Sequence, residues 1–163
     1  MTHTNSDFFN VFRTPRPWSA GMIAGLAGGA AEIVWIVLYM GWTGGDPERM
    51  PEGIVASVFP IAATTKVAIP LGILLHMAIA AVLGIVIVLA INMFCPQIRG
   101  TTHEKAFIIA VLIGVWAVNF FLILPVINPQ FITLVPYGTS LISKVLFGFT
   151  AAVVLQRLPW RTI

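Results

Sequence analysis

Charged side chains are scarce in this sequence. Asp, Glu, Lys and Arg make up 9% of the 163 residues, whereas an ordinary soluble domain has about 25%. Hydrophobic residues make up 58%, which is typical of a protein whose surface lies largely in lipid. The net charge is +3, but no run of basic residues occurs, so nucleic acid is not an expected partner.

Catalytic and metal-binding motifs are also missing. The sequence has no GxSxG, HExxH or CxxC pattern and no glycine-rich phosphate loop, so nothing points to an enzyme. Cys95 is the single cysteine, which excludes an internal disulfide. Cys95, His103 and Met93 lie close in sequence, but they are too few and too irregularly spaced for the four ligands of a closed metal site. We expect no bound metal.

What the sequence does contain is four long apolar stretches with short connections. Each is close to the roughly 20 residues that a helix needs to cross a bilayer. The predicted spans are residues 19–42, 71–94, 106–127 and 139–156. We therefore predict an all-α integral membrane protein, with one four-helix domain over residues 1–163 that is built as two sequential hairpins.

The segments outside the spans are predicted to lie at the membrane surface. Phe8, Phe9 and Phe12 fall on one side of a short N-terminal helix, as in an interfacial helix. The connections 43–70 and 128–138 hold apolar stretches that are bounded by prolines and too short to span. We expect these outer loops to lie on the surface or to re-enter the membrane. Because a span, a Pro-bounded loop and a span occur twice, the pattern indicates a weak internal repeat.

Basic residues outside the spans predict the orientation. With both termini inside, the inner side holds Arg13, Arg16, Arg99, Lys105, Arg157 and Arg161. The outer side then holds only Arg49 and Lys66. The excess of positive charge places both termini in the cytoplasm. The layout is similar to that of small four-helix bacterial inner-membrane proteins with Gly- and Ala-rich spans, so the bacterial inner membrane is the expected location.

Small residues recur at helical spacing in three of the spans. Residues four apart share a helix face, and a face of small residues lets a second backbone approach closely. The expected helix-packing residues are Gly21, Gly25, Gly28 and Gly29 in the first span, Gly72, Ala80 and Gly84 in the second, and Gly148 and Ala152 in the fourth.

Each span also carries one strongly polar side chain. These are Glu32, His76, Asn119 and Lys144. At a rise of about 1.5 Å per residue, all four fall at similar heights in the outer half of the bilayer. An ionised group at mid-bilayer costs about 2.5 to 3.5 kcal/mol on the insertion scale. We therefore expect Glu32 and Lys144 to pair within one polar cluster.

Three interpretations of this cluster are open. It can be an internal set of salt bridges and hydrogen bonds that fixes how the helices pack. It can exchange protons or ions, with Glu32 as the exchanging group and His76 as the relay. It can also face another polypeptide or a bound lipid, quinone or pigment. His76 is the only histidine within a span, so one chain cannot supply a bis-histidine haem, although a five-coordinate or dimer-shared haem is compatible with it.

The expected function is that of a non-catalytic integral subunit of a larger energy-converting membrane complex, respiratory or photosynthetic. Its partners would be other integral membrane subunits and lipids, without an intrinsic cofactor. The alternative is a small homo-oligomeric transporter or channel lined by Glu32, His76 and Lys144. A third hypothesis is an enzyme that acts on a lipid or quinone at the outer interface, which would need a reactive group that the sequence lacks.

Overall fold

The computed structural model describes residues 16–158. This part of the chain consists of helices and the turns that connect them, without strands. The predicted interfacial helix around Phe8, Phe9 and Phe12 lies outside the described residues, as do Arg13 and Arg161.

Four helical segments in the described chain are long and apolar enough to cross a membrane. They are α2 (Pro17–Thr43), α4 (Ala68–Phe94), the continuous segment Thr102–Ile127 and α7 (Tyr137–Arg157). Each predicted span lies within one of them. The prediction of an all-helical fold with four helices able to cross a membrane is thus confirmed for the described chain, whereas the two-hairpin arrangement stays a prediction.

The third span is not a uniform α-helix. It consists of α5 (Thr102–Val118), the π-helical turn η3 (Asn119–Ile123) and the short helix α6 (Leu124–Ile127). Pro125 has no N–H group to donate to the carbonyl of residue 121, so the α-helical hydrogen bonding is interrupted there. A π turn at such a point widens the helix and redirects the side chains that follow.

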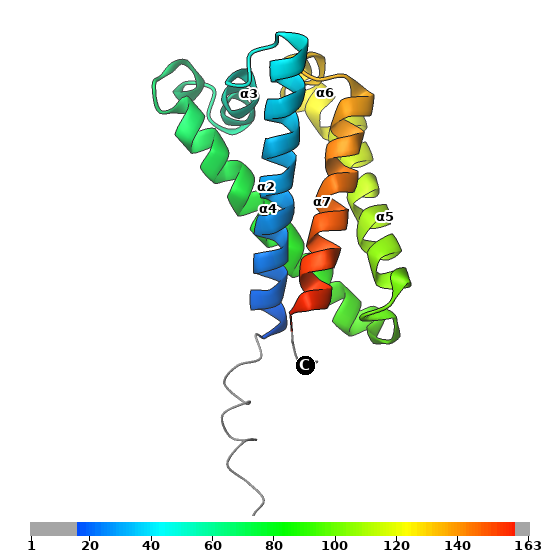
Figure 1. Ribbon diagram of the computed structural model, residues 1–163. Coiled ribbons are helices and arrows are strands. Elements are labelled where there is room, and N and C mark those ends of the chain that lie inside the picture. Colours follow the sequence, from blue (N-terminus) through cyan, green and yellow to red (C-terminus); the bar gives the residue numbers. More distant parts are fainter. Residues whose placement is uncertain (1–15, 159–163) are drawn as a thin grey trace, which may run out of the picture.

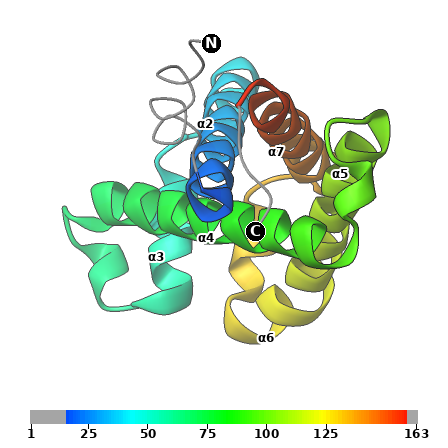
Figure 2. The ribbon, with the colours of Figure 1, turned by 90° about the horizontal axis from the view of Figure 1, so that it is seen from below.

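Three extensive helix contacts join the four spans in the described chain. α2 packs against both α4 and α7, and α5 packs against the other side of α7. Figure 2 shows α4 running across the view, whereas α2 and α7 are seen nearly along their axes. α4 is therefore steeply inclined to α2, and the two helices cross where Gly21, Gly25 and Gly29 face Ala80 and Gly84.

Glycine permits the close crossing of α2 and α4. A Cβ atom added at Gly25 would collide with the carbonyl of Ala80, and one added at Gly84 would collide with the carbonyl of Gly21. At Gly28, an added Cβ would lie 2.6 Å from the ring of Phe147 on α7. Backbones that approach this closely gain van der Waals contact, which is the main attraction between helices in lipid.

The remaining predicted packing residues have other neighbours. An added Cβ at Gly29 would lie 2.7 Å from Ala80 Cβ, and one at Gly148 would lie 2.9 Å from Ile109 of α5. Ala152 is fully buried in the core. Gly72 differs, because it contacts Pro51 of the connecting helix α3 (Arg49–Val58) and not another span.

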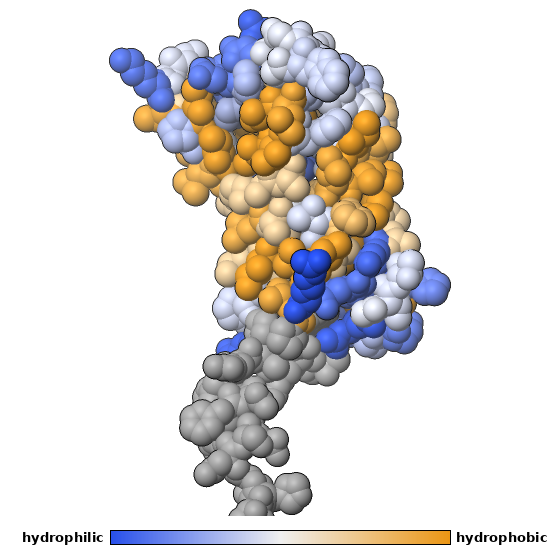
Figure 3. Space-filling model, viewed as in Figure 1, coloured by the Kyte–Doolittle hydropathy of each residue, from blue (hydrophilic) through white to orange (hydrophobic). Residues whose placement is uncertain are grey.

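The larger buried cluster of the described chain lies toward the first turns of α2 and the last turns of α7. Its buried residues come from all four spans and include Ala24, Val88, Ile91, Leu112, Phe147 and Leu155. On the face shown in Figure 3, apolar side chains also cover the outside at mid-height, with polar residues toward both ends. This banded surface is what a bilayer-spanning protein requires.

Two connecting segments cover the end opposite the termini. α3 lies against α4, and the 3-10 turn η4 (Pro129–Thr133) follows α6. The Asn128 side chain joins them, because its Nδ2 donates to Gly53 O at 3.2 Å and to Ser57 Oγ at 3.0 Å. The shorter 3-10 turns η1 (Ala62–Thr64) and η2 (Pro96–Ile98) complete the connections. Which end faces the cytoplasm stays a prediction.

Candidate functional site

Glu32 and Lys144 form an ion pair between α2 and α7. Lys144 Nζ donates to Glu32 Oε1 at 2.7 Å and to Oε2 at 2.9 Å. Glu32 is only 4% exposed, so its charge depends on these partners. Ser143 Oγ donates to the same Oε1 at 2.9 Å. Both carboxylate oxygens are thereby hydrogen-bonded in a low-dielectric setting, where an unpaired charge would be costly.

His76 brings α4 to the same point. Its Nε2 lies 3.2 Å from the carbonyl oxygen of Gly29 and 3.9 Å from Glu32 Oε2. The Gly29 carbonyl can only accept a hydrogen bond, so Nε2 carries the proton and Nδ1 of the neutral ring is left as an acceptor. His76 therefore adds a second hydrogen-bonding atom to the cluster without requiring a further charge.

Asn119 lies near the cluster but is not joined to it. Among the described residues, the Asn119 side chain makes no hydrogen bond to Glu32, His76 or Lys144. It is the first residue of the π turn η3 and lines the same cavity as the other three. Of the four polar residues singled out in the sequence, three are in contact, and the fourth shares only the cavity lining with them.

Two serines of α7 are functional neighbours that the sequence analysis missed. Ser143 donates to Glu32, and Ser140 Oγ accepts from Trp116 Nε1 at 2.8 Å. Ser140 precedes Lys144 by four residues and Ser143 precedes it by one. Because residues four apart share a helix face, the sequence could have shown that Ser140 lies on the same face of α7 as Lys144. The Trp116 bond fixes α5 to α7 next to the ion pair.

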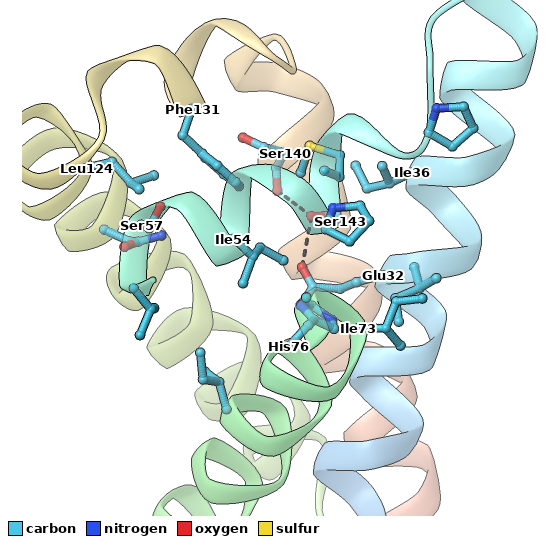
Figure 4. A pocket seen from close by; sticks show the side chains of 18 of the residues that line it. Glu32, Ile36, Ile54, Ser57, Ile73, His76, Leu124, Phe131, Ser140 and Ser143 are labelled. Carbon is cyan, nitrogen blue, oxygen red and sulfur yellow. Dashed lines mark hydrogen bonds and ion pairs between the residues drawn. The ribbon is translucent and has the colours of Figure 1, made fainter. Parts of the chain in front are cut away.

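A cavity of about 470 Å³ lies beside the ion pair. Figure 4 shows Glu32, His76 and Ser143 at one side of it, with Leu124 and Phe131 at the other. Most of its wall is apolar, and α3 contributes to it through residues such as Ile54. The packed core of the terminal half lies beyond the ion pair. The cavity is therefore confined to the half of the molecule that α3 covers.

Part of the cavity rim is exposed on the outside of the spans. Ile79 of α4 and Ile127 of α6 both line the cavity, yet they are 59% and 53% exposed. They belong to two spans that diverge because α4 is inclined. A rim of exposed apolar residues at this height faces hydrocarbon rather than water.

The cluster has the chemistry of a neutralised ion pair rather than of a metal centre. Within residues 16–158, no group of three or more His, Cys, Asp or Glu side chains is placed to hold a metal ion. Cys95 is a free thiol at the end of α4, outside the cavity lining. What the site offers is a fixed pair of opposite charges with a few unused hydrogen-bonding atoms around it.

Comparisons of the chain with protein-family models, with curated proteins and with solved structures find no match. No role is therefore transferred to Glu32, His76 or Lys144 from another protein.

Proposed function

We propose that this chain is a non-catalytic integral membrane protein that binds a small amphipathic molecule within the bilayer, as one subunit of a larger membrane complex. The observation that carries the proposal is the cavity beside the ion pair. It joins a mostly apolar wall to a small polar region formed by Glu32, His76 and Lys144.

The size and lining of the cavity support binding. Small-molecule sites usually measure about 300 to 1,000 Å³ and combine apolar walls with a few polar groups, and this cavity of about 470 Å³ fits that range. A protein interior is normally close-packed, and side chains that line an empty cavity lack van der Waals contacts on the cavity side. An apolar occupant would restore those contacts for side chains such as Ile54 and Leu124.

The hydrogen bonding of the cluster supports a non-catalytic role. A nucleophilic serine needs a base that accepts its proton. Ser143 donates to Glu32 and to the carbonyl of Ser140 at 2.7 Å, but Glu32 is already bound through both oxygens to Lys144. The carboxylate is committed to the ion pair, which disfavours it as a catalytic base.

Membership of a larger complex, respiratory or photosynthetic, is an expectation from the sequence. The expected helix-packing glycines, among them Gly21 and Gly25, pack against helices of this chain. Other subunits, a second copy or lipid would therefore contact the exposed apolar residues of α4 and α5, such as Leu74 and Val118.

The proposal is tested by purifying the protein in a gentle detergent and identifying by mass spectrometry every subunit and small molecule that remains bound. Ile54→Trp fills the cavity from α3, whereas Val82→Trp adds the same side chain to an exposed position outside the cavity lining. We expect one amphipathic compound in the wild type and in Val82→Trp, and at least about 10-fold less in Ile54→Trp. Equal amounts in all three proteins would contradict the proposal.

A second candidate function is transport of protons or ions. Three titratable side chains from three helices meet within 3.9 Å at one side of the cavity, and such intramembrane groups mark ion pathways in many proteins. In liposomes, a transporter would lose flux on Glu32→Gln but keep it on Glu52→Gln, which alters α3 outside the cavity lining. A wild-type flux equal to that of empty liposomes would exclude this candidate.

A further inference from the structure

The polar groups around the cavity have a limited set of free hydrogen-bonding positions. Lys144 has three N–H donors and uses two of them on Glu32. His76 has a free acceptor at Nδ1, because Nε2 is directed at Gly29 O. The Asn119 amide has no side-chain hydrogen bond within the described chain, so it offers both donors and an acceptor. The cavity can therefore donate to an oxygen atom and accept from a hydroxyl.

The charges of the site are already balanced. Glu32 and Lys144 neutralise each other, and no further Asp, Glu, Lys or Arg side chain lies within ion-pairing distance of either in residues 16–158. Glu48 also lines the cavity, but it belongs to the connection that precedes α3, is exposed, and forms no ion pair with Lys144. A charged head group placed beside the ion pair would thus lack a counter-charge of its own. In an apolar setting this is strongly unfavourable.

We infer that the cavity selects an amphiphile with an uncharged oxygen head group, a carbonyl or a hydroxyl, on a hydrocarbon body. This inference rests on the proposed binding function and names the class of its ligand. The head group lies beside Lys144 and His76, and its oxygen accepts from the free Lys144 donor. The Asn119 amide, which lines the same cavity, donates to an oxygen of the ligand. A hydroxyl hydrogen is accepted by His76 Nδ1.

The shape of the cavity fixes the direction of the ligand. The head-group atoms lie at the level of Glu32, where the packed core closes the cavity. The hydrocarbon body extends from there along Ile54, Leu124 and Phe131 (Figure 4). Asn119, on the third span, is then the residue that recognises the head group without belonging to the ion pair.

The test compares probes that share a long alkyl chain and differ in the head group. Hexadecanol and a decyl-substituted benzoquinone carry neutral oxygens, palmitate is anionic, hexadecyltrimethylammonium is cationic, and hexadecane has no head group. Each probe is added to the full-length protein in detergent, and the amount retained after gel filtration is measured. We expect the neutral oxygen probes to be retained at least about 10-fold more than the charged probes and hexadecane.

The outcomes separate this inference from the proposed function. Retention of hexadecane equal to that of hexadecanol, or stronger retention of palmitate, would overturn the inference and leave binding in the cavity intact. Failure of every probe to bind the wild type better than it binds Ile54→Trp would overturn both. Binding of the quinone but not of the alcohol, or the reverse, would support the inference and identify the oxygen as carbonyl or hydroxyl.

A variant of Asn119 gives a second and independent test. Asn119→Leu should reduce retention of the neutral oxygen probes about 10-fold and leave hexadecane unchanged, because it removes one pair of hydrogen-bonding groups. Asn92→Leu is the matched control, since that amide also has no hydrogen-bond partner in the described chain but lies outside the cavity lining. Equal effects of the two variants would contradict a head-group role for Asn119.

Discussion

Lys144 Nζ bonds both oxygens of Glu32, at 2.7 and 2.9 Å, across 112 residues of sequence. This ion pair joins α2, which also packs against α4, to α7, which carries α5 on its other side. The pair is therefore both a link between the two halves of the chain and the polar part of the cavity wall.

Removing one member of the pair should destabilise the protein more than removing both. Glu32→Leu or Lys144→Leu leaves an unpaired charge, and we expect each variant to lose about 3 kcal/mol of unfolding free energy. This is the lower end of the range for buried ion pairs, because Lys144 borders the cavity. The double variant should lose less than either single variant. Unfolding of all four proteins in detergent gives the coupling energy, and additive losses would mean that the two side chains do not interact.

The crossing of α2 and α4 should not tolerate a methyl group. In Gly25→Ala, the new Cβ would collide with the backbone carbonyl of Ala80, which cannot move like a flexible side chain. We expect a loss of about 1 to 3 kcal/mol, the usual cost of overpacking. Gly114→Ala is the control, because nothing lies within 4 Å of that position. Equal stabilities for the two variants would argue against a close contact at Gly25.

Asn128 should hold α3 in place over the cavity. Its amide bonds two groups of α3, so Asn128→Leu leaves α3 with its contacts to α4 but without its polar link to the α6–α7 connection. We expect faster hydrogen exchange in α3 and unchanged exchange in the core of α2. Thr133→Val is a suitable control, since that hydroxyl bonds only locally to Gln130 O. Unchanged exchange in α3 would rule out the link.

The orientation in the membrane can be measured with single cysteines. In a Cys95→Ser background, Asp46→Cys marks the end covered by α3, and Gln97→Cys marks the end nearest the termini. From the distribution of basic residues, a membrane-impermeant thiol reagent added to intact bacterial cells should label only Asp46→Cys. Labelling of Gln97→Cys alone would invert the predicted topology.

The spans and the ion pair could be predicted because each is determined by one large unfavourable free energy in lipid, that of an unsatisfied backbone group or that of an isolated charge. Backbone groups in lipid must bond within a helix, so an apolar stretch of sufficient length is enough to place a span. The free energy of placing an isolated charge in the bilayer similarly predicted that Glu32 and Lys144 form an ion pair. A constant rise per residue then placed His76 near both of them.

The position of Asn119, the neighbour of Gly72 and the cavity depend on how the helices pack. Hydropathy and residue spacing do not predict that packing. Asn119 was expected within the cluster, but it begins the π turn near Pro125 and stays apart from the other three. Gly72 was expected to be a helix-packing residue, and the backbone that approaches it is Pro51 of the connecting helix α3. The cavity is lined by residues of all four spans and of α3, and their positions depend on tertiary packing.

Because the cavity rim at Ile79 and Ile127 is exposed on the outside of the spans, occupancy of the cavity depends on the ligand concentration in the membrane and not on that in water. A molecule that reaches the cavity through this rim arrives by lateral diffusion in the membrane, so its supply is set by partitioning and not by its solubility in water. Because each buried CH₂ group favours transfer out of water by about 0.8 kcal/mol, long-chain compounds are strongly enriched there. Occupancy then depends on the mole fraction of the ligand among the lipids, and even a modest affinity would keep the site filled.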